Sequence, residues 1–292
     1  PPQVLASVIR LQGAWDGWAT MINTRGVFPT GLLRHATRAL ELRMGLAVSV
    51  TDSRVQEAGA SPWAPPPPLF DFQADALEGW LKMGRGVVEA PPRSGKTRIA
   101  AAAIARLGLP AVVVCPTKHV CGQTAAAISR WMPGRVELVT GGTPSAKRLR
   151  ALRTVPVWVG TPQTIAGPKR GGRRTGISGL HTRRVLIVDE FHHSAAQTYL
   201  DLSMAAEQAF WRLGLTGTHY RADGRDMVMR GVLGGVAYSA SVADMIDAGR
   251  LVPARVAMVR IPGRRGWGGR EAYREGVVQH DGRNDALAHC AR

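Results

Sequence analysis

The stretch that most constrains the fold is residues 90–97, Ala-Pro-Pro-Arg-Ser-Gly-Lys-Thr, which separates an apolar run ending at Glu89 from a helix-like run beginning at Arg98. The prolines and the glycine interrupt both runs, so the pattern predicts a strand, a tight turn and the N-terminus of a helix. Backbone N–H groups in such a turn bind phosphate oxygens, the Lys reaches the β- and γ-phosphates, and the Thr hydroxyl holds Mg²⁺. We therefore predict a site for ATP and Mg²⁺ formed by Pro92, Arg93, Ser94, Gly95, Lys96 and Thr97.

Short apolar runs alternate with helix-like stretches after this turn. The runs are continuous rather than alternating, which is typical of strands buried on both faces of a parallel sheet. The predicted strands are 111–115, 136–139, 155–160, 185–188 and 212–215, and the predicted helices between them are 120–131 and 195–210. This alternation predicts an α/β fold with right-handed crossovers.

The chain divides by composition into four parts. Residues 1–60 predict a small α+β accessory domain, with strand-like stretches at 4–11 and 46–50 and a helix-like stretch at 30–45. Four consecutive prolines make 61–68 a stiff linker. We expect 69–262 to form the main α/β lobe and 263–292 to lead toward a further domain. The first residue is Pro rather than Met, so we expect a longer reading frame.

The charge of the chain favours a polyanionic partner. There are 38 Lys and Arg against 21 Asp and Glu, which gives a net charge of +17. Such an excess is typical of nucleic-acid-binding proteins, although the Arg usage of a GC-rich genome is an alternative explanation. The three cysteines form no CxxC pair, and no apolar run is long enough to span a membrane. We expect a reduced cytoplasmic protein, bacterial or from a phage in its host, with no membrane partner.

An acidic pair, Asp189 and Glu190, follows the predicted strand 185–188. The carboxyl ends of parallel strands share one edge of a sheet, which brings this pair to the phosphate-binding turn. Asp189 can then hold Mg²⁺ with Thr97, and Glu190 can take a proton from the attacking water. The alternative is an acidic pair that favours the dipole of a helix N-terminus.

The sequence Asp-Glu-Phe-His at 189–192 resembles the DExH box of superfamily 2 nucleic-acid helicases and translocases, and residues 90–97 resemble their motif I. The resemblance implies a RecA-like P-loop lobe that hydrolyses ATP, with His192 as a coupling residue. Residues 69–73 resemble the adenine-reading Q-type segment, which implies that Gln73 bonds the adenine edge and that Phe70 stacks nearby. An aromatic helix start is the alternative for that segment.

Further segments follow in the order expected of this family. The resemblance implies that motif Ia, a Gly-Gly segment and a Thr-Pro motif contact the backbone of one nucleic-acid strand without reading its sequence. These contacts are Pro116, Thr117, Gly141, Gly142, Thr161 and Pro162. Motif III is resembled by residues 213–221, which implies that Thr216 and Thr218 couple nucleotide state to strand binding. Gly217 stands where the family usually has Ala, and His219 stands where it usually has Pro.

Residues 244–254 resemble a segment found in the DNA-directed branch that includes type III restriction translocases, xeroderma group B-type helicases and phage recombination helicases. The resemblance implies an ATP-dependent DNA helicase or translocase acting on single- or double-stranded DNA. Three alternatives remain: the motor subunit of a restriction–modification complex, an RNA-directed helicase, and a non-hydrolysing nucleic-acid-binding module.

The motifs of a second RecA-like lobe are missing, including any Gln-x-x-Gly-Arg-x-x-Arg pattern that would carry arginine fingers. We expect that lobe in the same reading frame or on a partner chain. An arginine finger contributes about 10³–10⁵ in rate, so this chain alone should bind ATP weakly and hydrolyse it poorly.

Overall fold

The structure, a computed structural model, divides into two compact units, residues 1–251 and 252–292. The described residues are 10–12, 18–20, 26–51, 62–141, 154–170, 173–174, 176–190, 196–217, 226–253 and 281–290. Within those ranges no helix combines the length and the apolar character that crossing a membrane requires.

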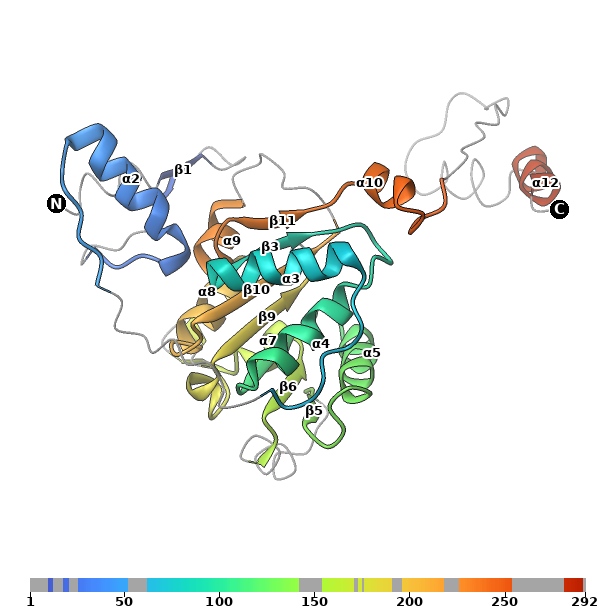
Figure 1. The fold of residues 1–292 in the computed structure, drawn as a ribbon, viewed down its shortest axis with the longest axis horizontal. Helices are drawn as coiled ribbons and strands as arrows, with labels where there is room; N and C mark the ends of the chain where they lie inside the picture. The colour runs from blue at the N-terminus through green and yellow to red at the C-terminus, as the bar shows by residue number, and fades with distance from the viewer. Residues whose placement is uncertain are drawn as a thin grey trace. The chain divides into compact units, whose positions relative to one another are not determined.

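A seven-stranded parallel sheet forms the centre of the first unit (Figure 1). Its spatial order is β11-β3-β10-β9-β4-β6-β5, and every neighbouring pair is parallel. The strands are β3 (Arg85–Glu89), β4 (Ala111–Val114), β5 (Val136–Val139), β6 (Val157–Gly160), β9 (Val185–Asp189), β10 (Trp211–Thr216) and β11 (Val236–Ser239). The predicted α/β fold with a parallel sheet is confirmed.

Helices cover both faces of the sheet. The helices on one face, toward the viewer in Figure 1, are α3 (Asp71–Met83), α4 (Lys96–Leu107) and α5 (Lys118–Ser129). The helices of the other face are α7 (Pro162–Ile165), α8 (Ala196–Ala205) and α9 (Asp226–Leu233). Successive strand residues alternate between two apolar cores: Val113 and Ile187 pack in the first, Val112 and Leu186 in the second. Burial on both faces explains why the strands are continuous apolar runs.

The remaining elements lie outside the sheet and its covering helices. They are β1 (Arg10–Gln12), β2 (Trp18–Thr20), η1 (Thr30–Leu32), α2 (Leu33–Met44), β7 (Lys169–Arg170), β8 (Arg173–Arg174), η2 (Leu180–Thr182), α10 (Val242–Asp247) and α12 (Asp281–Cys290). Turn η1 packs against α9, where a Cβ on Gly31 would collide with the Arg230 carbonyl. Leu32 is buried in this contact, and Arg85 Nη1 donates to Thr30 Oγ1 at 2.8 Å.

The predicted helix at 30–45 is confirmed, but the predicted strand at 46–50 is wrong. Leu46 and Val50 are exposed, and no strand among the described residues pairs with this stretch. Most of the predicted strand at 4–11 lies outside the described residues.

Several predicted boundaries also shift for local reasons. β6 starts at Val157 because Pro156 has no N–H to donate to the ladder. α5 starts at Lys118, earlier than predicted, because the Thr117 hydroxyl caps it by accepting from Val120 N at 3.2 Å. α8 ends at Ala205, well before the predicted 210.

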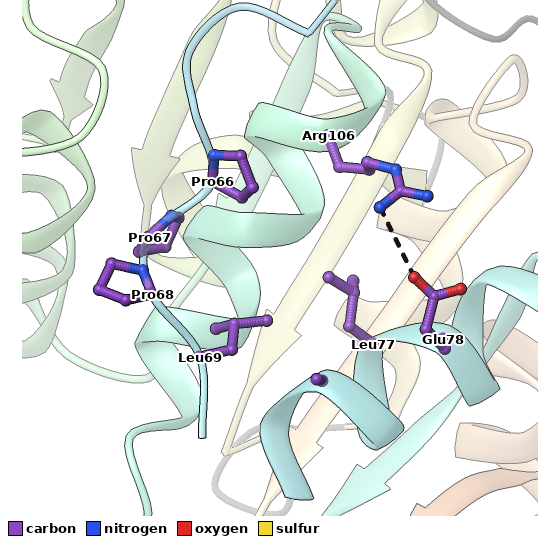
Figure 2. A pocket seen from close by; sticks show the side chains of 8 residues that line it. Pro66, Pro67, Pro68, Leu69, Leu77, Glu78 and Arg106 are labelled. Atoms are coloured by element: carbon purple, nitrogen blue, oxygen red, sulfur yellow. Dashed lines mark ion pairs between the residues drawn. The ribbon is translucent and has the colours of Figure 1, made fainter. Parts of the chain in front are cut away.

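The proline-rich segment runs in an extended conformation along α4. Trp63 N donates to Ala105 O at 3.2 Å, and Arg98 Nη1 donates to Pro68 O at 3.3 Å. Between this segment, α3 and α4 lies a cavity of ≈ 320 Å³, lined by Pro66, Pro67, Pro68, Leu69, Ala74, Leu77, Glu78 and Arg106 (Figure 2). No residue of the phosphate-binding turn lines it.

A buried arginine ties the end of α8 to the sheet. Arg212 on β10 is 4% exposed, and its guanidinium donates to the carbonyls of Ser203, Ala206, Ala209 and Val232 and to the Ser203 hydroxyl. Carbonyl groups at a helix C-terminus need such donors because they have no partner within the helix. Arg212 therefore fixes where α8 stops.

Replacing Arg212 with Met should lower the free energy of unfolding by about 3–5 kcal/mol, because several buried carbonyls lose their donor at once. Urea unfolding followed by circular dichroism measures this loss. Arg38→Met on exposed α2 is the matched control and should stay within about 0.5 kcal/mol of the parent chain. Equal stability of the two variants would contradict this account.

Candidate functional site

The phosphate-binding turn has the backbone shape that its sequence requires. Gly95, directly before α4, adopts φ 82°, and Arg93 adopts φ 66°. A Cβ on Gly95 would lie 2.6 Å from Gln73 Nε2, so both its φ and its surroundings require glycine. Ser94 N donates to Pro91 O at 3.2 Å, which closes the turn. The turn therefore ends at the N-terminus of a twelve-residue helix, where backbone N–H groups favour an anion.

Lys96 lies over this turn and links it to the acidic pair. Its ammonium donates to Ala90 O at 3.0 Å and to Pro91 O at 3.3 Å, and it forms an ion pair with Glu190 Oε1 at 3.3 Å. The side chain is only 9% exposed. Phosphate oxygens attract an ammonium more strongly than neutral carbonyls do, so these contacts are ones that a nucleotide can replace.

The Ser94 hydroxyl also indicates that the turn binds a ligand. It is buried and has no hydrogen-bond partner in the part of the chain that the structure describes. A buried polar atom without a partner is costly in a native protein and points to a ligand that would supply one. Thr97, in the first turn of α4, is half-buried. The residues present thus fit nucleotide phosphates with an accompanying Mg²⁺.

The acidic pair lies at the carboxyl end of β9. Asp189 is the last residue of the strand, and Glu190 follows with φ 46°, an unusual backbone conformation for a residue other than glycine. Two contacts to the neighbouring strand hold it: Glu190 N donates to Leu215 O at 2.9 Å, and Gly217 N donates to Glu190 Oε2 at 3.5 Å. Strained conformations of this kind persist where surrounding structure fixes them, and here the result is a carboxylate at Lys96.

Burial of the Asp189 carboxyl and, to a smaller extent, the nearby Glu190 charge raise its pKa, the Lys96 ammonium opposes both, and the net result is a pKa of about 6. The charged form of Asp189 is therefore disfavoured in the chain without a cation. A divalent cation at this position would reverse that preference, as expected of a metal-binding carboxylate.

The end of β10 contacts both the phosphate-binding turn and Lys96. Thr216 is 1% exposed, and its carbonyl accepts from Ala90 N at 3.0 Å. A Cβ on Gly217 would lie 3.3 Å from Lys96 Nζ, so an alanine here would crowd the ammonium. The turns after β3, β9 and β10 are thus in mutual contact. His192 and Thr218, the remaining predicted coupling residues, lie outside the described residues.

Gln73 has a structural role that sequence reasoning missed. It is 1% exposed, its Nε2 donates to Ser94 O at 2.8 Å, and its Oε1 accepts from Phe70 N at 3.1 Å. It therefore joins the start of α3 to the phosphate-binding turn. The Phe70 ring is 40% exposed. The adenine-reading roles of Gln73 and Phe70 stay predictions. The only sequence signal for the link between Gln73 and the turn was their short separation along the chain.

The predicted nucleic-acid contacts follow β4, β5 and β6, which are neighbours in the sheet. Thr161 caps α7, accepts from Thr164 N at 3.4 Å and shares a 2.9 Å hydrogen bond with the Thr164 hydroxyl. It is 8% exposed and Pro162 is buried, whereas Thr117 and Gly141 are exposed. Pro116 is half-buried, and Gly142 lies outside the described residues. The structure brings Pro116, Thr117, Gly141, Thr161 and Pro162 to one end of the sheet; their contact with nucleic acid stays a prediction.

Asp189→Asn should stabilise the chain in the absence of Mg²⁺ at pH 8. The folded-state pKa of Asp189, about 6, lies above its ordinary value of 3.8. The protein that carries Asp189 therefore loses stability as the pH rises from about 4 to above 6. A shift of about two pKa units corresponds to roughly 2–3 kcal/mol in the free energy of unfolding. The substitution should gain this amount at pH 8 and little at pH 4. Thermal unfolding of both proteins at the two pH values measures this gain. The exposed Asp247→Asn is the control, and no gain at pH 8 would contradict the burial argument.

Comparisons with known proteins agree with this arrangement. The sequence profile described as "Type III restriction enzyme, res subunit" matches residues 67–221. The chain is 26% identical over 177 residues to the DNA 3'-5' translocase XPB2 of Sulfurisphaera tokodaii, covering 61% of this chain and 37% of that protein. It is 30% identical over 197 residues to the DNA 3'-5' helicase XPB of Mycobacterium tuberculosis, covering 66% and 34%.

The fold is also that of a known helicase. The crystal structure of the UvsW helicase from bacteriophage T4 superimposes with a TM-score of 0.65 at 15% identity, covering 81% of this chain and 92% of that one. The chain spans between 34% and 37% of the length of the two XPB relatives. With a profile that matches more than half of its residues, including both the phosphate-binding turn and the acidic pair, the chain belongs to the family of the type III restriction enzyme res subunit.

Proposed function

We propose that the chain is the ATP-binding lobe of a DNA helicase or translocase, which couples ATP hydrolysis to movement along DNA. One observation carries the proposal: Lys96 of the phosphate-binding turn pairs with Glu190, which in turn accepts from Gly217 at the end of β10. Phosphoryl transfer needs a lysine at the phosphates and a carboxylate that orients the attacking water. A motor also needs a contact that links this carboxylate to a neighbouring strand. All three meet within hydrogen-bonding distance here.

Each residue has a definite part in this proposal. Backbone N–H groups of Gly95 and of the first residues of α4 bind phosphate, and the Lys96 side chain leaves the Ala90 and Pro91 carbonyls to bind the β- and γ-phosphates. Thr97 and Asp189 would hold Mg²⁺. When bound, the cation would neutralise charge that develops on the phosphate oxygens. Glu190 orients the attacking water and accepts its proton.

The neighbouring half of the sheet edge would bind DNA. The turns after β4, β5 and β6 offer exposed Thr117 and Gly141, whose backbone and hydroxyl groups suit phosphate contacts that ignore sequence. The net charge of +17 adds long-range attraction for a polyanion. Since β4 pairs directly with β9, the proposed DNA contacts adjoin the acidic pair, and Thr216, Thr218 and His192 would relay nucleotide state between them.

A second RecA-like lobe, on the same reading frame or a partner chain, would complete the ATP site. The relatives named above are a translocase and a helicase that act on DNA 3'-5' and are much longer than the matched region. We place the activity in the cytoplasm of a bacterium or of a phage-infected host, where the buried free thiols of Cys115 and Cys121 would remain reduced.

A restriction–modification motor is the second candidate, because the matching family is named for the res subunit of a type III restriction enzyme. Both candidates use the same lobe, and a nuclease domain elsewhere in the reading frame would decide for restriction. A non-hydrolysing binding module is disfavoured, because Lys96, Asp189 and Glu190 are all present and converge at the turn.

Two substitutions test the proposal, and each should affect a different step: the first should affect ATP binding and the second turnover. Lys96→Ala should abolish binding of a fluorescent ATP analogue, because the phosphates lose their principal cation. Glu190→Gln should retain binding but reduce DNA-stimulated turnover of the full reading frame by about 10²-fold or more, because the water loses its base. Fluorescence titration measures the first effect, and phosphate release with DNA or RNA added measures the second.

Matched controls are the exposed Lys82→Ala on α3 and Glu207→Gln after α8, which should behave as the parent protein. Persistence of turnover in Glu190→Gln would exclude the assigned base. Stimulation by RNA but not by DNA would move the assignment to an RNA-directed helicase.

A further inference from the structure

The cavity of ≈ 320 Å³ between the proline-rich segment, α3 and α4 has no part in the proposed nucleotide site. Figure 2 shows Pro66, Pro67 and Pro68 on one side of this cavity and the Glu78–Arg106 ion pair on the other. Sites for small molecules have volumes of about 300–1,000 Å³, so the cavity is large enough to be one.

The lining of the cavity is apolar where it is buried and charged where it is open to solvent. Leu77 is 4% exposed and Pro67 is buried. The side chains of Glu78 and Arg106 are 52% and 53% exposed. In sites for small molecules, an apolar lining supplies most of the contact and a few polar groups fix the orientation of the ligand. The lining therefore suits a molecule with an apolar body and one charged end.

The proline-rich wall is held in place along α4. Trp63 N donates to Ala105 O at 3.2 Å, and Arg98 Nη1 donates to Pro68 O at 3.3 Å, so the segment is fixed at both ends. The proline rings themselves restrict the backbone between these two points. The cavity is therefore formed before a ligand arrives, and binding costs little ordering of the protein.

The charged end of the ligand is best matched by a carboxylate. Arg106 Nη1 and Glu78 Oε1 lie 3.6 Å apart in a half-exposed ion pair, and such pairs contribute little to stability. A ligand carboxylate can replace Glu78 and accept two parallel hydrogen bonds from the planar guanidinium. The alternative is a cationic ligand on Glu78, which the net charge of +17 disfavours.

The apolar body of the ligand is best matched by planar aromatic rings. Three successive prolines form one wall, and extended proline-rich segments commonly pack against aromatic rings in proteins. Aromatic rings supply a large contact area with few rotatable bonds to order. An apolar cavity of about 150 Å³ holds a benzene ring, so ≈ 320 Å³ has room for two fused rings.

We propose that this cavity binds a small aromatic carboxylate, with its rings between the prolines and Leu77 and its carboxylate on Arg106. The inference goes beyond the proposed function and does not depend on it, because no residue of the phosphate-binding turn lines the cavity. ATP should therefore not displace the aromatic carboxylate.

The test uses 2-naphthoate as the probe and 2-naphthamide, which has the same rings but no charge, as its comparison. For a ligand of this size we expect a dissociation constant of about 0.1–1 mM, which titration followed by ligand-observed NMR measures on the whole chain. Arg106→Gln should weaken binding of 2-naphthoate by about fivefold to tenfold and leave binding of 2-naphthamide unchanged. Glu78→Gln should tighten binding of 2-naphthoate, because the competing carboxylate is gone.

The exposed Arg130→Gln and Glu207→Gln are the matched controls for one positive and one negative charge, and neither should change the binding of either probe. Ala74→Leu, which adds apolar volume to the lining, should weaken both probes. Failure of 2-naphthoate to bind the parent chain would overturn the proposal. Unchanged binding of 2-naphthoate in Arg106→Gln, or its displacement by ATP, would overturn it as well.

Discussion

Parallel pairing of β3, β10 and β9 is the constraint on which the whole proposed nucleotide site depends. Its register sets Thr216 opposite Glu89 and Leu215 opposite Asp189, so the three strands end level with one another. Two backbone hydrogen bonds, from Ala90 to Thr216 and from Glu190 to Leu215, then join the turns that follow. The Lys96–Glu190 ion pair is a consequence of that ladder, because a one-residue shift in either pairing would separate the two side chains.

In the proposed function, the edge of the sheet has a nucleotide half and a DNA half that meet between β9 and β4. The turns after β3, β10 and β9 carry the groups suited to phosphates and Mg²⁺. The turns after β4, β6 and β5 carry the hydroxyl and glycine positions suited to a nucleic-acid backbone. Because neighbouring strands lie only about 5 Å apart, a small movement of one half must be accommodated by the other. This proximity is a physical basis for coupling that needs no long pathway.

The sequence was most informative where local chemistry alone decides the structure. The valine-rich runs became buried strands, and the Gly-Lys-Thr turn became a helix N-terminus, since each pattern has few other stable solutions. The stretch 46–50 failed because its apolar residues found no partner strand, which periodicity cannot reveal. β11 was not predicted because its residues are only partly buried and its register shifts between Val236 and Tyr238. The cavity lined by the proline-rich segment, α3 and Arg106 joins separate segments and left no local signal.

All the proposed nucleotide and DNA site residues described above lie at the carboxyl ends of the strands. The turns at the opposite rim of the sheet carry none of them. The turn between α5 and β5 is an example: Gly134 adopts φ 74°, and nothing lies within 4 Å of the direction in which a side chain would project. Extra residues inserted there would extend into solvent rather than into either half of the edge. That turn is thus an attachment point for a fluorophore or an affinity handle that lies away from the proposed nucleotide and DNA contacts.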